Sequence, residues 1–487
     1  MLRVRLIGFV ALAVLPTGAK VDSVPVYDVV LLHGRVMDPE SGLDAVRAVA
    51  VQAGKVRAIG GTPRGRDTID ARGLVVAPGF IDLHQHAQHP AAYAVEAAAG
   101  ITTALELEDG TGDVDRWYDE RVGKGLINYG VSIGEGHARM IVMHDTIGRT
   151  EPVGDAANRR ATPSEYAAIM REIEHGLQRG AVAVGFPIAY TPAASTQEIL
   201  DEFRIAARYH ASCHVHMRSV EHDDDLTDIE EVVAAALVTG APLQIVHMNA
   251  AAQDLTPQYL RIVADARARG LDVTTEMYPY TAGMGEIEAA SLNDWEKQPD
   301  EWFARKEWPP TGERLTRESF ARYRQQKGFV VMYPKDEAVA EAWVRAAVRD
   351  SLPMIASDGI LDDSGHGHPR VAGTFARILG QYVREQHDLS LMSALRRMTL
   401  APARRLERRV PAMRDKGRLR VGADADLVLF DPARIIDRAT YREPTLAPVG
   451  IPFVLVNGVV VVRGGRVQSG VFPGRPIRAP VQQLDAR

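Results

Sequence analysis

Apolar runs of the kind found in buried β-strands alternate with amphipathic or alanine-rich stretches over residues 78–405. Strands buried on both faces give continuous apolar runs, and the stretches between them have helical periodicity. The eight runs are GFIDLHQH, TTALELED, INYGVSIG, AVAVGFPI, SCHVHMR, LQIVHMN, VTTEMYPY and MIASDG. Eight strand–helix units predict an α/β fold, a (β/α)8 TIM barrel, whose reactive groups lie at the carboxyl ends of the strands.

Shorter β-branched runs, broken by Gly and Asp, occupy both ends of the chain, at 26–77 and 418–480. Neither stretch is long enough to bury a substantial core alone. We expect antiparallel strands from both ends to form one small β-sandwich domain, with residues 20–77 as its first part and 406–487 as its second part and C-terminal tail. An insertion at about 281–353, which contains three tryptophans, is expected on the active face, where it can act as a lid.

Residues 1–19 match a secretory signal peptide, with two arginines, a short apolar run and a small-residue cleavage site. This predicts a periplasmic or secreted protein, with a first β-strand and a cytoplasmic location as the alternative. The apolar run is too short for a stable membrane span. The net charge of −6 and the absence of basic tracts argue against nucleic acid as a partner. The single cysteine, Cys213, is expected to be a small buried apolar residue.

Polar side chains that bind metals end five of the predicted barrel strands. Alternation along a strand puts His84 and His86 on one face, about 7 Å apart. Because the strand ends share one rim, these side chains are expected to converge. Zinc binds three or four nitrogen and oxygen ligands of this kind and leaves a position for water. The candidate ligands are His84, His86, Glu106 or Glu108, His216, His247 and Asp358.

Several longer motifs resemble the amidohydrolase superfamily and, within it, the N-acyl-D-amino-acid deacylases, or D-aminoacylases. The resemblance covers about residues 26–475. The two-histidine motif and the Asp of strand eight are shared widely in the superfamily, whereas YPYTAG and HPR-x-x-GTF are much narrower. The other matching stretches are GITT, GAVAVGFPIAYTP, HVHMRS, IVHMN, MTLAPARRL and GADADLVLFDP.

The resemblance implies one or two zinc ions and a role for each strand-end residue. His84 and His86 would hold one metal position, His216 and His247 the other, and Asp358 would be both a ligand and the general acid/base. Many superfamily members bridge the metals with a carboxylated lysine in strand four, and the deacylases use a cysteine after strand two; this chain has neither.

A carboxylate is an anionic oxygen donor that can replace the missing bridge. Glu108 is preferred because it shares the face of Glu106 and lies nearer the strand end, whereas Asp109 should point the other way unless the strand is bulged. A gap-free match to the family favours Asp109 instead. These acids can also simply pair with arginine or cap the following helix.

The chemistry implied is hydrolysis of the amide bond of N-acyl amino acids, with the D enantiomers indicated by the family. A metal-bound hydroxide would attack the acyl carbon, and Asp358 would move the proton. The substrate is a small molecule with a carboxylate, for which Arg370 is the candidate partner, because a guanidinium can bind it through two hydrogen bonds. Tyr190 and Tyr278 follow strands four and seven and can add hydroxyl donors. Asn249, where the family has lysine, removes one charge.

Two other functions fit parts of the pattern. A cyclic-amide amidohydrolase, like dihydroorotases and hydantoinases, shares the metal constellation but normally has the strand-four lysine. A catalytically silent barrel that serves as a binding scaffold would not need all five ligands.

His137 and Arg139 match a feature of the deacylases without an assigned role, and His366 and His368 flank Arg370 in a loop where they can support it. The acyl group, the amino acid and the oligomeric state are not predicted.

Overall fold

The computed structural model describes residues 25–145, 151–218 and 226–482. The predicted signal peptide, residues 1–19, lies outside the described residues. Among these residues no helix is both long and apolar enough to cross a bilayer.

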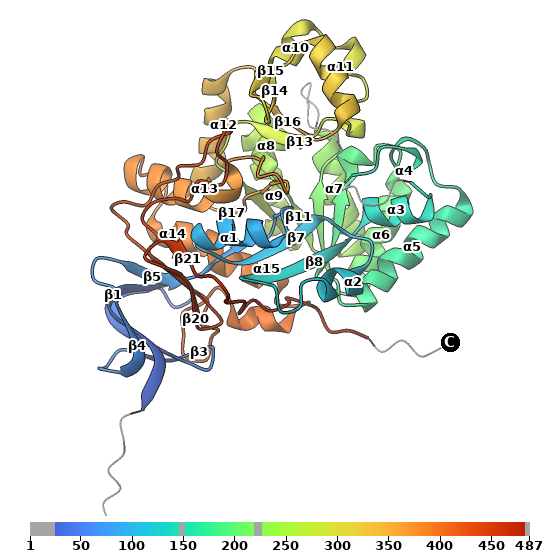
Figure 1. The fold of residues 1–487 in the computed structure, drawn as a ribbon. Helices are drawn as coiled ribbons and strands as arrows, with labels where there is room; N and C mark the ends of the chain where they lie inside the picture. Colours follow the sequence, from blue (N-terminus) through green and yellow to red (C-terminus); the bar gives the residue numbers. More distant parts are fainter. Residues whose placement is uncertain (1–24, 146–150, 219–225, 483–487) are drawn as a thin grey trace, which may run out of the picture.

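Eight parallel strands form the central barrel, and each corresponds to one of the eight predicted runs (Figure 1). The two ends of the strand order, β6 and β17, are linked just beyond their last residues by a parallel bridge between Gln85 and Gly359. The predicted TIM barrel is therefore confirmed. In chain order its strands are β6 (Phe80–Asp82), β7 (Ile101–Thr111), β8 (Asn128–Gly134), β9 (Ala183–Pro187), β10 (Ser212–His216), β11 (Leu243–Ile245), β12 (Val273–Met277) and β17 (Pro353–Ile355).

Helices surround the barrel and bury the outer faces of the strands. Residues such as Val184, Val215 and Ile245 are fully buried against them, which explains the continuous apolar runs. The helices are α1 (Pro90–Ala98), α2 (Val114–Asp119), α3 (Glu135–Val142), α4 (Asp155–Asn158), α5 (Pro163–Gln178), α6 (Thr196–Arg208), α7 (Thr227–Thr239), α8 (Met248–Ala252), α9 (Thr256–Ala268), α12 (Glu337–Arg349), α13 (Arg370–Arg377), α14 (Leu391–Leu395) and α15 (Ala401–Leu406).

Both ends of the chain join in a second, nine-stranded sheet with its own apolar core. The two halves meet where β5 pairs antiparallel with β18, at Val76 and Leu429. The sheet is mixed rather than antiparallel throughout, because β1 pairs in parallel with both β4 and β5. Its strands are β1 (Val26–Asp38), β2 (Leu43–Gln52), β3 (Lys55–Ile59), β4 (Arg64–Asp70), β5 (Val75–Pro78), β18 (Leu427–Phe430), β19 (Phe453–Val456), β20 (Val459–Arg463) and β21 (Arg466–Val467).

The insertion before the last barrel strand is a small subdomain at the top of Figure 1. Trp302, Phe303, Trp308 and Phe320 form its core. It is shorter than the predicted 281–353, because residues 337–349 form α12, which packs against α9 as a helix of the barrel. Its elements are β13 (Gly283–Glu286), α10 (Asp300–Ala304), β14 (Lys306–Trp308), β15 (Glu313–Arg314), α11 (Arg317–Gln326) and β16 (Phe329–Met332).

Candidate active site

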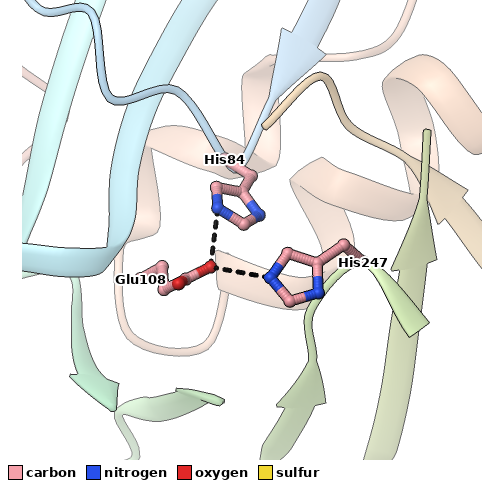
Figure 2. Close-up of side chains that lie close together, drawn as sticks. All are labelled: His84, Glu108 and His247. Carbon is pink, nitrogen blue, oxygen red and sulfur yellow. Dashed lines mark ion pairs between the residues drawn. The ribbon is translucent and has the colours of Figure 1, made fainter. Parts of the chain in front are cut away.

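The polar residues at the strand ends converge on the rim of the barrel beneath the insertion. Figure 2 shows the carboxylate of Glu108, from β7, between the imidazoles of His84 and His247. Its Oε2 lies 2.7 Å from Nε2 of His84 and 3.4 Å from Nε2 of His247. Its Oε1 lies 2.8 Å from Nδ1 of His216. One carboxylate therefore contacts histidines from three different strand ends.

A second group of donors adjoins the first and shares His84 with it. Nε2 of His86 lies 3.1 Å from Nε2 of His84. Oδ1 of Asp358, which follows β17, lies 3.3 Å from Nε2 of His86 and 3.5 Å from Nε2 of His84. Donor atoms arranged tetrahedrally at about 2.0–2.1 Å around one zinc ion are about 3.3–3.4 Å apart, so this spacing fits a metal site.

The hydrogen bonds of the two histidines orient their Nε2 atoms toward each other. Nδ1 of His84 lies 2.7 Å from Oε1 of Glu276, and Nδ1 of His86 lies 2.8 Å from Oε2 of Glu106. A carboxylate only accepts hydrogen bonds, so each Nδ1 carries a proton and each ring directs its Nε2 at the other. Nε2 can bind a cation when the ring is neutral. Two imidazole nitrogens and the carboxylate of Asp358 then meet in a buried space, which suits a shared cation.

The carboxylates around this space favour a cation within it. Burial alone would lower the pKa of His84, but the carboxylates of Glu108 and Asp358 outweigh it and raise that pKa well above its usual value. Burial alone would raise the pKa of Asp358, but the charges of Arg370 and His84 outweigh this effect. The pKa of Asp358 therefore lies below its usual range, and its carboxyl group is ionised. The site favours a positive charge at its centre.

The end of β7 departs from regular alternation, which is the condition under which Asp109 was expected to face the site. Its pairing with β8 shifts register between Glu106 and Thr111, and Asp109 turns toward the site, with Oδ2 3.1 Å from Nδ1 of His86. Two glycines permit this path. A Cβ at Gly134 would lie 2.0 Å from the carbonyl oxygen of Asp109, and one at Gly185 would lie 1.9 Å from that of Glu108.

Backbone conformation at two strand ends is also unusual. His247 has φ +28° and Asp358 has φ +52°, in the left-handed region that residues with a Cβ seldom adopt. Strained φ values of this kind persist where surrounding contacts fix them, and they cluster at functional sites. Both residues are candidate metal donors at the rim.

Glu276 and Gln244 belong to the site but were not predicted from the sequence. Oε2 of Glu276 accepts a hydrogen bond from Nε2 of Gln244 at 2.8 Å, while Oε1 faces His84. Both side chains are essentially inaccessible to solvent. The signal was present, because Glu276 is the one charged residue within β12.

Arg370 lies at the site, but it is engaged differently from the prediction. Its Nη2 lies 2.8 Å from Oδ1 of Asp358, and its Nε donates to the backbone oxygen of the same residue. The guanidinium carbon is 4.6 Å from the ring centroid of Tyr278. The ring of Tyr190 lies 4.9 Å from that of His216, and both tyrosines line the cavity above the site.

Three polar residues that the sequence singles out contact the backbone or a neighbouring acid, namely His368, His366 and Asn249. His368 is buried and links Arg370 to the insertion, because its Nδ1 accepts from the backbone of Arg370 and its Nε2 lies 3.0 Å from the oxygen of Ala282. His366 only pairs with Asp362. Nδ2 of Asn249 donates to the backbone oxygen of Tyr278.

Arg139 and His137, to which the sequence assigns no role, lie beside other parts of the barrel. Arg139 is fully buried against Glu198 and two backbone oxygens, so it ties α3 to α6 rather than entering the site. His137 lies with Nδ1 3.2 Å from the backbone oxygen of Asp109. Cys213 is buried, as predicted.

Comparisons with known proteins agree with this geometry. The amidohydrolase family model matches residues 67–125 and 145–462. An N-acyl-D-glutamate deacylase of Alcaligenes xylosoxydans xylosoxydans is 30% identical, over 93% of this chain and 96% of its own length. The crystal structure of N-acyl-D-glutamate deacylase from Bordetella bronchiseptica, complexed with zinc and a phosphonate inhibitor, matches with a TM-score of 0.80 and 26% identity, over 93% of this chain and all of that one.

A structure of D-aminoacylase, from work on the role of its binuclear metal centre, matches with a TM-score of 0.78 and 25% identity, and covers 93% of this chain and all of that one. The family model spans more than half of the chain, and the likeness extends through both domains. The chain therefore belongs to the amidohydrolase family.

Proposed function

We propose that this protein is a zinc-dependent hydrolase that cleaves the amide bond of N-acyl amino acids, with the D enantiomers as substrates. The observation that carries the proposal is the convergence of buried histidines and carboxylates from five strand ends on one rim. The relatives support the reaction class, because an N-acyl-D-glutamate deacylase and a D-aminoacylase match over 93% and 90% of this chain.

Each donor has a role that its contacts support. His84, His86 and Asp358 would form one zinc position, and Glu108, with His216 and His247 around it, would form or bridge to a second. Glu108 takes the place of the strand-four lysine and of the cysteine after strand two, neither of which this chain has. Zinc in such a site makes water nucleophilic at neutral pH and polarises a carbonyl.

Asp358 is placed to move the proton during hydrolysis. Its carboxylate is ionised and lies between the histidines and Arg370, so it can accept a proton from the attacking water and deliver it to the departing amine. Arg370 would bind the α-carboxylate of the substrate, with Tyr190 and Tyr278 beside it. Because Nη2 of Arg370 already contacts Asp358, the substrate and Asp358 would share one guanidinium.

Cyclic-amide hydrolysis is a weaker candidate. β9 carries no lysine. The backbone of Glu108 packs closely against this strand, because a Cβ at Gly185 would lie 1.9 Å from the carbonyl oxygen of Glu108. A silent scaffold is weaker still, because it would not require buried carboxylates and imidazole nitrogens to face one another.

The test combines metal analysis with hydrolysis assays on paired N-acetyl-D- and N-acetyl-L-amino acids. Purified protein should contain one or two zinc ions and release the D-amino acid. His216→Ala and His247→Ala should lose zinc and activity together, whereas His175→Ala, at an exposed position on α5, should change neither. Full zinc content in both rim variants, or no release from any substrate pair, would refute the proposal.

Export to the periplasm or medium is proposed on residues 1–19 alone. Expression of the full chain in a Gram-negative host, followed by N-terminal sequencing of the periplasmic protein, tests it. Protein found only in the cytoplasm with an intact N-terminus would contradict it.

A further inference from the structure

The cavity above the metal donors is larger than a small N-acyl amino acid requires. Its volume is about 710 Å³, and His86, Glu108, His216, His247 and Asp358 lie on its floor. Pockets of about 300–1,000 Å³ hold drug-sized ligands, whereas an N-acetyl amino acid is much smaller. Most of the cavity is therefore left for another part of the substrate.

The upper wall of the cavity has an apolar strip that comes largely from the insertion. Its side chains are Met284, Leu292, Trp295, Phe329 and Met332, and α12 contributes Val339 and Trp343 opposite them. Leu292, Trp295, Phe329 and Met332 are partly exposed, while Arg370 and Tyr278, near the floor, are buried. The cavity thus runs from a buried polar end to a more exposed end, where these apolar side chains lie beside charged ones of both signs.

Two arginines along the cavity already have carboxylate partners. Arg218 is paired with Glu231 at 2.8 Å, and Arg370 is paired with Asp358. Asn249, which replaces a lysine of the family pattern, is neutral and bonded to the backbone. The other charged residues of the wall are mixed in sign and are Glu151, Asp254, Asp294, Arg305, Lys306, Lys335 and Asp336.

These observations fix how a substrate can be arranged. The α-carboxylate must reach Arg370 at the buried end, and the acyl carbon must lie at the metal donors. In this arrangement the acyl chain is the part that extends toward the exposed end of the cavity. Partly exposed Leu, Trp, Phe and Met side chains there gain by being covered with apolar surface.

We propose that the acyl group of the substrate is a long apolar chain, of about eight carbons or more, that lies in the groove formed by the insertion and α12. The inference rests on the proposed deacylase function and specifies its substrate class.

The experiment measures kcat/KM for the zinc-loaded enzyme in two series. In one, the amino acid is D-alanine and the acyl group is lengthened from acetyl to butanoyl, octanoyl and dodecanoyl. In the other, the acyl group is acetyl and the side chain is enlarged from D-alanine to D-leucine and D-phenylalanine. A fully buried methylene contributes at most about a fourfold gain, so we expect about a 100-fold rise from acetyl to octanoyl and a smaller one in the side-chain series.

Variants locate the effect in the groove. Leu292→Asp and Met332→Asp should each lower the octanoyl-to-acetyl ratio about tenfold. Leu237→Asp, a matched change at a position 63% exposed on α7, should leave the ratio unchanged. Competition by free octanoate against free acetate gives the same comparison in the unaltered enzyme, where folding of a variant plays no part.

The outcomes separate the inference from the function on which it rests. Hydrolysis of acetyl substrates with a flat or falling acyl series would overturn the inference and leave the deacylase function standing. A gain confined to the side-chain series would overturn it as well. No release of D-amino acid from any compound would refute the proposed function and the inference together.

Discussion

Glu276 offers a sharp test of how the proposed zinc site is held. It is 1% exposed and uses both carboxylate oxygens, one on Nδ1 of His84 at 2.7 Å and one on Nε2 of Gln244 at 2.8 Å. The first contact fixes the proton of His84 on Nδ1 and leaves Nε2 free to bind metal. Removing Glu276 should therefore weaken zinc binding although Glu276 contacts no metal.

Two substitutions of Glu276 should weaken zinc binding to different degrees. Glu276→Gln keeps the shape and one acceptor but exchanges a charged hydrogen bond, worth about 1.5–3 kcal/mol, for a neutral one worth about 0.5–1.5 kcal/mol. The difference of about 1 kcal/mol predicts zinc affinity about fivefold weaker. Glu276→Leu also leaves the Nδ1 proton of His84 buried without an acceptor, at a further cost of about 1–3 kcal/mol. We expect affinity about 10²-fold weaker for this variant.

The assay is competition for zinc with a chromogenic chelator at fixed pH, so that activity plays no part. Glu96→Gln is the matched control. Glu96 is also a fully buried glutamate, and burial raises its pKa well above the usual range, but it contacts none of the candidate ligands. Its replacement should leave zinc affinity unchanged. If both Glu276 variants bind zinc as tightly as the unaltered protein, the role assigned to Glu276 is wrong.

The other predictions concern the donors and the substrate anchor. Asp358→Asn should retain zinc in large part but lose hydrolysis by about 10²-fold or more, measured as D-amino acid release; an active variant would mean that another group moves the proton. Glu108→Gln should weaken the binding of at least one zinc ion more than Glu106→Gln or Asp109→Asn does, as measured by metal content after dialysis. The opposite ranking would assign the bridging role to Glu106 or Asp109. Arg370→Lys should raise KM and lower kcat, because one ammonium cannot replace a guanidinium fork, and equal turnover of an N-acyl amino acid and its amide by the unaltered enzyme would place carboxylate recognition elsewhere.

The barrel and its rim could be predicted because both depend on local patterns. Each of the eight apolar runs became a barrel strand, and parallel strands in a closed barrel bring their carboxyl ends together without further information. The convergence of His84, His216 and His247 follows from that geometry. Likewise, neither terminal stretch could bury a core alone, and both share one sheet.

Features that depend on contacts between distant segments could not be predicted in this way. The orientation of Asp109 follows from the close approach of β7 to Gly134 and Gly185, which are remote in sequence. The extent of the insertion was overestimated because helix periodicity in 337–349 does not show whether that helix packs on the barrel or on the subdomain. Glu276 was overlooked because a single acid in a strand does not reveal which histidine lies above it.

The pair formed by Asp358 and Arg370 joins two roles that the sequence treats as separate. From the motifs, Asp358 is a proton carrier and Arg370 a carboxylate anchor. In the structure, Nη2 of Arg370 lies 2.8 Å from Asp358 and holds its pKa low. A substrate carboxylate that draws on the same guanidinium weakens its hold on Asp358, so Asp358 becomes a better base once the substrate is bound. Arg370→Lys should therefore affect kcat as well as KM, whereas an anchor independent of Asp358 would affect binding alone.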